Sequence, residues 1–249
     1  HVRLGKTYQT YIQQDGDEYN FNQNCITNSM YYGVPQRRER AIFLLVRKDI
    51  DYKWEFPAPE KQVTLETAFQ GIPDLWPIVK EATFRNCIPT NSPEALSFHE
   101  WHKPPQHVRI NIECMHYTTT GNTDFDNEIN VHKKLKGDRV KGYDTAYHRM
   151  FWDKPAPTVT MWNGIMGSQN NVHPGRVWGK DSNGNVMYTN PRVLSIYELM
   201  IVSSLPIDWN IPDWANEQLI RFVIGEGIPP LMVKKIVEPI ISLSNGKSI

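Results

Sequence analysis

The sequence has no excess of either charge and no apolar run long enough to cross a membrane. Lysine and arginine together number 27, and so do aspartate and glutamate, so the 249-residue chain has no net charge that attracts nucleic acid or a membrane surface. Any nucleic-acid-binding surface must therefore be local. No apolar stretch approaches membrane-spanning length and no signal peptide opens the chain, which predicts a cytoplasmic protein with no membrane partner.

Cysteine is scarce, and residues that could bind a metal are poorly grouped. The three cysteines are widely spaced and form no Cys-x-x-Cys pair, which predicts a reducing compartment and no disulfide framework. His99 and His102 with Cys114 and His116 could supply four zinc ligands, but their spacings match no common zinc module. We therefore interpret the histidines as loop residues and predict no metal site.

The stretch with the clearest chemical character joins arginines to an apolar run. Residues 41–46 read Ala-Ile-Phe-Leu-Leu-Val, the pattern of a strand buried on both faces. Before it, after a Gly-Val-Pro turn, Gln36, Arg38 and Arg40 share one face of an extended segment, because alternate side chains point the same way. Donors on one face suit a phosphate, a carboxylate or a base edge. The alternative is a surface arginine cluster that caps a core strand.

Local signals predict several further elements. Residues 25–31 have strand propensity and are expected to pair with 41–47, and residues 181–185 form a turn between short strands. Ser195 and Glu198 form a capping box at the start of a helix. A last helix begins at Pro230 and carries a 3.6-period apolar stripe of Val233, Ile236, Val237, Ile240 and Ile241.

Residues 131–150 carry local positive charge within the neutral chain. Two aspartates oppose six basic residues, a net charge of +4, and the basic residues are Lys133, Lys134, Lys136, Arg139, Lys141 and Arg149. This pattern predicts a surface that follows nucleic-acid phosphates, and a solvated loop is the alternative. The polar, Gly-rich loop at 163–176 has donors and acceptors for base edges, although a plain surface loop has a similar composition.

Two segments of the chain resemble motifs of the DNA cytosine-C5 methyltransferases. Residues 33–40, Gly-Val-Pro-Gln-x-Arg-x-Arg, resemble the Gln-x-Arg-x-Arg motif, whose two arginines line the pocket that receives a flipped-out cytosine. Residues 147–160 resemble the conserved part of the target-recognition domain. The resemblance implies that Thr158, in the Thr158-Val159 dipeptide, contacts the DNA backbone near the flipped nucleotide.

Two later segments continue the resemblance. Residues 191–198, Pro-Arg-Val-Leu-Ser-Ile-Tyr-Glu, match the helix start that closes the recognition domain in this family. Residues 225–230, Gly-Glu-Gly-Ile-Pro-Pro, are similar to the last motif, usually Gly-Asn-x-Val-Pro-Pro, whose loop lies against S-adenosylmethionine. Gly225, Glu226 and Gly227 are therefore implied to bind the cofactor. Glu226 replaces the usual asparagine, so the hydrogen bond expected from that amide is in question.

Other family motifs have no match in this chain. It contains no Pro-Cys dipeptide, no Glu-Asn-Val and no Phe-x-Gly-x-Gly, which in the family supply the catalytic cysteine, the acid that protonates cytosine and the cofactor loop. The chain also begins with His1 rather than methionine. We therefore expect the C-terminal part of an enzyme, inactive alone, whose partner is an N-terminal segment or subunit with the catalytic cysteine.

The resemblance implies an α/β fold and three divisions of the chain. The fold is expected to be the C-terminal part of a Rossmann-like, S-adenosylmethionine-dependent methyltransferase domain plus a smaller β-rich target-recognition domain. Residues 1–58 end the catalytic domain, 59–189 form the recognition domain, and 190–249 return to pack on the catalytic domain. Gln36, Arg38 and Arg40 are the implied catalytic-pocket residues, and the expected DNA contacts are Lys133, Lys134, Lys136, Arg149, Thr158 and Val159.

The implied reaction transfers a methyl group from S-adenosylmethionine to C5 of a flipped cytosine in specific sites of double-stranded DNA. A cysteine thiolate adds to C6, and the base must leave the stack because C5 and C6 are otherwise unreachable. DNA methylation in a prokaryotic or phage-encoded restriction-modification setting is the expected context. The alternatives are a non-catalytic DNA-specificity subunit of a split methyltransferase and, third, an RNA-directed relative.

Overall fold

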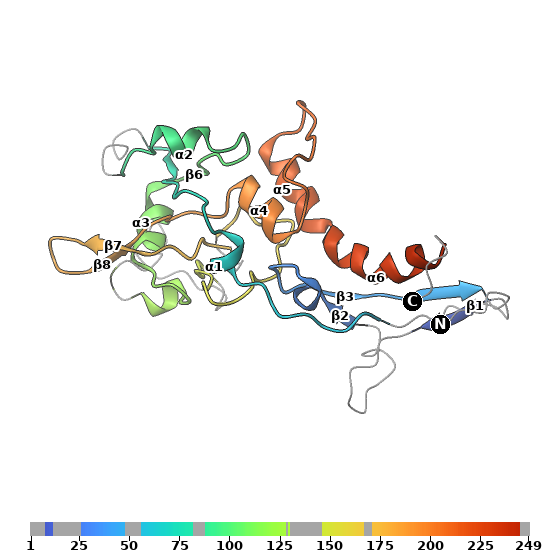
Figure 1. Cartoon of the computed structure of the whole chain (residues 1–249). Helices are drawn as coiled ribbons and strands as arrows, with labels where there is room; N and C mark the ends of the chain where they lie inside the picture. Colours follow the sequence, from blue (N-terminus) through green and yellow to red (C-terminus); the bar gives the residue numbers. More distant parts are fainter. Residues whose placement is uncertain are drawn as a thin grey trace.

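The computed structural model describes residues 8–11, 26–47, 56–81, 88–127, 129, 146–166 and 171–244. Helices and short strands alternate along the chain, so the fold is α/β as predicted. Figure 1 shows an elongated molecule with the β7–β8 hairpin at one end, and helix α6 with strands β1 to β4 at the other. Within the described part of the chain, every sheet has two strands. No helix there is long and apolar enough to span a membrane.

The N-terminal strands form two antiparallel pairs. β2 (Ile26–Asn28) pairs with β3 (Glu39–Ala41), whereas β4 (Leu44–Arg47) pairs with β1 (Tyr8–Tyr11). The predicted pairing of 25–31 with 41–47 is therefore correct only at Ala41, because residues 44–47 pair with β1 instead.

The prediction that the 41–46 run is buried on both faces is wrong for the side chains that the structure describes. Ala41 is exposed and Phe43 is 55% exposed, because no described element covers them. A 3-10 turn (Ser29–Tyr32) follows β2 and ends at Gly33, whose φ of 76° is a conformation that favours glycine. This turn brings the chain into the arginine-containing loop.

The middle of the chain is less β-rich than expected. β5 (Ile78–Val79) and β6 (Gln106–His107) form a two-residue parallel pair, and Pro77 and Pro105 precede them, removing backbone donors that a longer ladder needs. β7 (Val177–Lys180) and β8 (Val186–Tyr188) form the antiparallel hairpin around the predicted 181–185 turn. The helices of this region are α1 (Leu65–Ala68), α2 (Pro93–Ser97), α3 (Arg109–Tyr117) and a 3-10 turn (Asp124–Asp126).

The C-terminal helices supply most of the main core. α4 (Ile196–Val202) packs against α5 (Glu217–Glu226) and α1, and its buried residues Leu199 and Met200 join Leu65, Met150 and Ile220. The predicted capping box is confirmed, because Ser195 accepts a hydrogen bond from the Glu198 amide and Glu198 accepts one from the Ser195 amide.

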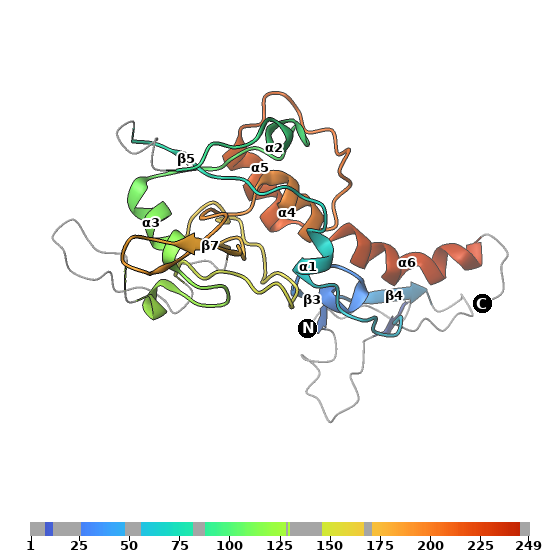
Figure 2. The ribbon, with the colours of Figure 1, turned by 60° about the vertical axis from the view of Figure 1, so that its left-hand side comes forward.

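α6 (Pro230–Ser244) begins at Pro230 as predicted and lies alongside the N-terminal strands in both Figure 1 and Figure 2. Met232 and Ile236 are buried against Tyr32 and Val34. The rest of its apolar stripe is not a buried face in this chain, since Val233, Ile240 and Ile241 are exposed.

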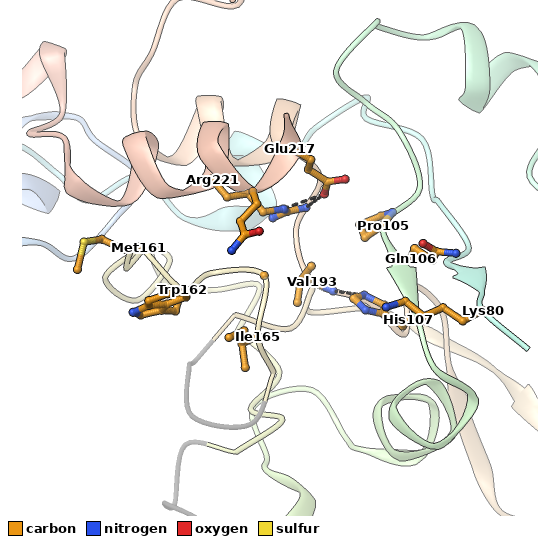
Figure 3. Close-up of a pocket in the computed structure, with 12 residues that line it drawn as sticks. Lys80, Pro105, Gln106, His107, Met161, Trp162, Ile165, Val193, Glu217 and Arg221 are labelled. Carbon is orange, nitrogen blue, oxygen red and sulfur yellow. Dashed lines mark hydrogen bonds and ion pairs between the residues drawn. The ribbon is translucent and has the colours of Figure 1, made fainter. Parts of the chain in front are cut away.

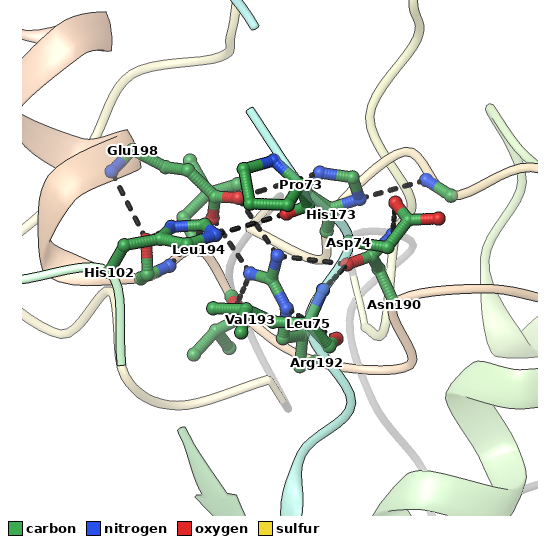
Figure 4. A network of polar contacts seen from close by, with 12 residues as sticks. Pro73, Asp74, Leu75, His102, His173, Asn190, Arg192, Val193, Leu194 and Glu198 are labelled. Atoms are coloured by element: carbon green, nitrogen blue, oxygen red, sulfur yellow. Dashed lines mark hydrogen bonds and ion pairs between the residues drawn. The ribbon is translucent and has the colours of Figure 1, made fainter. Parts of the chain in front are cut away.

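A buried polar network joins the middle of the chain to α4 (Figure 4). Arg192 is fully buried and donates to both carboxylate oxygens of Glu198, at 2.7 and 2.8 Å. It also donates to the Leu75 carbonyl at 2.9 Å and to the Asn190 side chain at 2.9 Å. Because each buried charge here has an ionic or hydrogen-bonded partner, the network fixes residues 190–198 against 73–75.

Candidate functional site

Gln36 joins three segments that are distant in the sequence. Its side-chain nitrogen donates to the Val202 carbonyl at 3.1 Å, at the end of α4, and to the Ser203 hydroxyl at 3.3 Å. Its side-chain oxygen accepts a hydrogen bond from the Val159 amide at 3.2 Å. Gln36 is 1% exposed, so each polar atom is bonded to protein rather than to solvent. Its position is therefore fixed by the fold.

Arg38 makes the second link and is 3% exposed. Its guanidinium donates to the Val159 carbonyl and, at 2.6 Å, to the Gly225 carbonyl near the end of α5. Burial, followed by the nearby charge of Arg40, lowers the pKa of Arg38 to about 10. Its Nε atom is buried without a hydrogen-bond partner, and no described carboxylate lies within ion-pair distance of the guanidinium. Among the described residues, the positive charge of Arg38 is therefore balanced by carbonyl dipoles rather than by a carboxylate.

Backbone hydrogen bonds hold the arginine loop beside residues 156–159. The Arg37 amide donates to the Ala156 carbonyl at 2.7 Å, and the Ala156 amide donates to the Pro35 carbonyl at 2.9 Å. The exposed Thr158 adds a hydroxyl bond of 2.8 Å to the Arg37 carbonyl. We call this junction of residues 35–38, 156–159 and Gly225 the arginine seam. Thr158 and Val159, predicted from the recognition-domain resemblance, lie here.

The other arginines of the loop lie outside the interior of the seam. Arg40 is half-buried and donates to the Glu39 carbonyl at 2.6 Å, so it does not share the environment of Gln36 and Arg38. Burial lowers the pKa of Arg40 as well. Arg37 is exposed and lines a cavity of about 430 Å³ with Lys154. Sequence reasoning missed Arg37 and Lys154, because their shared cavity depends on the seam.

Arg149 is not available to DNA in this structure. It is fully buried, and its guanidinium donates to the Met115 carbonyl at 3.0 and 2.7 Å and to the His173 carbonyl at 2.7 Å. Burial lowers its pKa to about 9. We therefore correct its expected role to that of an interior residue that holds α3 to the strand-like 171–176 segment. Lys133, Lys134 and Lys136 lie outside the described residues.

The three residues with an implied cofactor role differ in environment. A Cβ at Gly225 would collide with the Thr160 carbonyl, so glycine is required where α5 meets the seam. Glu226 and Gly227 are exposed, and Gly227 lines a cavity of about 150 Å³ with Trp209 and Pro229. Small-molecule sites usually enclose roughly 300–1,000 Å³, so these residues fit one edge of a cofactor site rather than a complete one.

The histidines once considered for zinc have hydrogen-bonding roles. His102 contacts the Ser195 hydroxyl at 3.1 Å and the Pro73 carbonyl at 3.0 Å, and His116 contacts the Tyr188 carbonyl at 2.8 Å. Cys114 is fully buried in α3. In the ranges that the structure describes, no group of three or more potential ligands is placed to hold a metal ion.

The sequence is similar to a family of DNA methylases and to individual methyltransferases. The profile of the family described as C-5 cytosine-specific DNA methylase matches residues 3–242. The Type II methyltransferase M1.HgaI of Avibacterium volantium is 38% identical over 225 residues, covering 90% of this chain and 56% of that protein. The Type II methyltransferase M.BbvI of Brevibacillus brevis is 25% identical over 210 residues, covering 84% and 46%. This chain spans about half the length of these relatives.

A solved structure supports the fold independently. It is described as a DNA modification methyltransferase encoded within an E. coli prophage, and it superposes with a TM-score of 0.51 at 17% identity. The match covers 96% of this chain and 62% of that one, and at this identity it speaks for the fold alone. The family match extends over nearly the whole sequence, and the chain therefore belongs to the C-5 cytosine-specific DNA methylase family.

Proposed function

We propose that this chain is the C-terminal part of a DNA cytosine-C5 methyltransferase that acts on specific sites in double-stranded DNA. The arginine seam is the observation that carries the proposal. It brings together the segments that resemble the cytosine-pocket motif, the recognition domain and the cofactor motif, through Arg38 bonds to Val159 and Gly225. The proposed divisions remain 1–58, 59–189 and 190–249.

The chemistry requires a nucleophile that we assign to another stretch of polypeptide. Attack at C6 of cytosine needs an accessible cysteine thiolate. Cys114 is fully buried, and neither Cys25 nor Cys87 follows a proline as in the family motif. We infer that a preceding segment or a separate subunit carries the catalytic cysteine and that residues 1–249 alone do not methylate DNA.

Residues of this chain have proposed roles around the reacting base. The buried cation of Arg38 and the half-buried Arg40 line the pocket for the flipped cytosine, with Gln36 fixing the loop that presents them. Thr158 contacts the DNA backbone, and Lys133, Lys134 and Lys136 follow phosphates. Members of this family use S-adenosylmethionine, which supplies the methyl group. Gly225, Glu226 and Gly227 contribute one edge of its site, where Glu226 offers an exposed carboxylate.

A reconstitution experiment tests this proposal. The chain is purified alone and together with the polypeptide encoded immediately upstream, and tritium transfer from labelled S-adenosylmethionine to mixed-sequence duplex DNA is measured. We expect transfer only with both components. Turnover by the chain alone would overturn the assignment of the nucleophile to another polypeptide.

The second candidate is a non-catalytic DNA-specificity subunit in a restriction-modification system. The observation that favours it is the absence of a Pro-Cys dipeptide from a chain that carries a segment resembling the recognition domain. The two candidates differ in which polypeptide supplies the cytosine pocket. Arg40→Ala in the reconstituted enzyme should reduce the methyl transfer rate if the pocket lies here, and should only change site preference if the chain is a specificity subunit.

A further inference from the structure

A cavity of about 500 Å³ lies next to the arginine seam and has no role in the function proposed above (Figure 3). One wall is the loop at residues 161–165, which begins two residues after the Val159 carbonyl that Arg38 binds. β6 and Lys80 lie across the cavity from this loop, and α5 borders the cavity between them. The cavity therefore opens between the recognition segment and the C-terminal helices.

The loop wall presents large apolar side chains to solvent. Met161, Trp162 and Ile165 are all exposed, and Trp162 is 49% exposed with its ring edge against Phe222 at 6.5 Å between centroids. Exposing three such side chains within five residues is unfavourable unless they bind something apolar. A flat aromatic face beside an open cavity is suited to stacking.

This exposure is built into the loop. Asn163 is buried between the exposed residues and donates to the Thr160 carbonyl and the Arg221 carbonyl, both at 2.8 Å. Arg221 returns a bond to the Asn163 side-chain oxygen at 3.1 Å. Asn171 donates to the Ile165 carbonyl at 3.1 Å. Because the inward residues fix the loop, Trp162 and Ile165 are held outward before any ligand arrives.

The other sides of the cavity supply polar groups of the kind that read a base edge. Gln106 and Gln218 are exposed amides, each with donors and an acceptor, and a glutamine amide can pair with a base through two hydrogen bonds. The cation of Lys80 is exposed, and no described carboxylate lies within ion-pair distance of it. Arg221 is already bonded to Glu217 and the Leu194 carbonyl, so it forms the floor.

We propose that this cavity binds a single unstacked nucleobase of the DNA strand, with its face on Trp162, its edge on Gln106 or Gln218, and its phosphate near Lys80. Aromatic stacking and amide contacts are how proteins hold bases that have left the stack. The base is a second one, distinct from the target cytosine at the seam. This inference rests on the DNA-binding function proposed above.

The test measures binding of the reconstituted enzyme to three labelled duplexes by fluorescence anisotropy. One duplex is fully paired, one carries a single bulged adenine, and one carries an abasic bulge. We expect the bulged adenine to bind roughly ten-fold more tightly than the other two, within the range of base–aromatic stacking. Equal affinity for the adenine bulge and the abasic bulge would overturn the proposal.

Variants separate stacking from general effects. Trp162→Ala should abolish the ten-fold preference, whereas Trp162→Phe should keep most of it. Trp214→Ala is the matched control, because Trp214 is 77% exposed and does not line the cavity. A preference that survives in Trp162→Ala contradicts the inference.

The outcomes also distinguish the cavity from the proposed function. Binding of the paired duplex with no gain from the bulge rejects the cavity and leaves the function standing. A Trp162-dependent gain for the bulge without binding of the paired duplex supports the cavity and contradicts recognition of duplex sites. Binding of none of the three duplexes rejects both.

Discussion

Two buried arginines of this protein differ in what balances their charge. Arg192 has a carboxylate partner, Glu198, that binds it through two hydrogen bonds, and the surrounding network satisfies the remaining donors (Figure 4). Within the part of the chain that the structure describes, Arg38 is bonded to carbonyls and its Nε has no hydrogen-bond partner. A buried cation without a counter-charge is costly. Arg149 is likewise buried and bonded to main-chain carbonyls, so this environment alone does not indicate function. We interpret Arg192 as serving the fold, and we propose that Arg38 serves the chemistry because it lies in the segment that resembles the cytosine-pocket motif.

The largest effect is expected from breaking the balanced pair. Glu198→Gln leaves Arg192 buried without its ionic partner, which should lower the free energy of unfolding by about 3–5 kcal/mol. Urea unfolding of the wild type and the variant measures this loss. The matched control is Glu66→Gln, whose partner Arg176 is exposed, and which should cost at most about 1 kcal/mol. Equal losses in the two variants would contradict the distinction between buried and exposed pairs.

Acid should weaken the region around Arg192 next. Burial lowers the pKa of His173 well below its usual value and that of His107 to about 3, so both are neutral in the folded protein at pH values where the unfolded chain protonates them. The two neutral histidines therefore contribute their full stability above about pH 6.5. As the pH falls below that value, the free energy of unfolding decreases by up to roughly 1.4 kcal/mol per pH unit for each histidine.

The carboxylate of Glu198 acts in the same direction at lower pH. Burial raises its pKa, but the charge and hydrogen bonds of Arg192, with His173, outweigh burial and hold that pKa well below the usual range. Its contribution is present above about pH 4.5 and is lost below it. Unfolding free energies measured between about pH 7.5 and pH 2.5 test both contributions. His107→Gln should reduce the decrease in the free energy of unfolding just below about pH 6.5. An unchanged pH dependence would contradict the role given to His107.

The smallest effect is expected from the basic run at residues 133–141. The triple variant Lys133→Ala, Lys134→Ala, Lys136→Ala in the reconstituted enzyme should weaken binding to target and non-target duplexes alike. It should reduce the salt slope by up to about 0.9 for each phosphate contact removed. Substitutions in the 163–172 loop should instead reduce the difference in affinity between target and non-target duplexes. A lysine variant that lost discrimination and kept its salt slope would reverse this division of roles.

Local signals were predictable from the sequence because they depend on neighbours a few residues apart. The capping box of Ser195 and Glu198 and the start of α6 at Pro230 were both confirmed. The sequence predicted that the Glu198 carboxylate caps α4. It did not predict that the same carboxylate also forms a buried ion pair with Arg192.

Long-range partners were not predictable from composition or periodicity. Arg149 had the charge expected of a DNA contact, yet its guanidinium is bonded to main-chain carbonyls in the interior. The apolar run at 41–46 divides between two strand partners, because β1 lies more than thirty residues earlier in the chain. Trp162 could not be distinguished from a core residue until Asn163 was seen to hold the loop outward.

The most direct test of the central claim replaces Arg38 with methionine and takes two measurements on the same preparation. Methionine is apolar and of comparable length, but it leaves the Val159 and Gly225 carbonyls without their donor, so the free energy of unfolding should fall by about 1–3 kcal/mol for each carbonyl left unbonded. The methyl transfer rate of the reconstituted enzyme should fall by a factor of ten or more, since a charged donor to a bound base contributes about 1.5–3 kcal/mol. A normal rate together with a large loss of stability would show instead that Arg38, like Arg192, serves the fold.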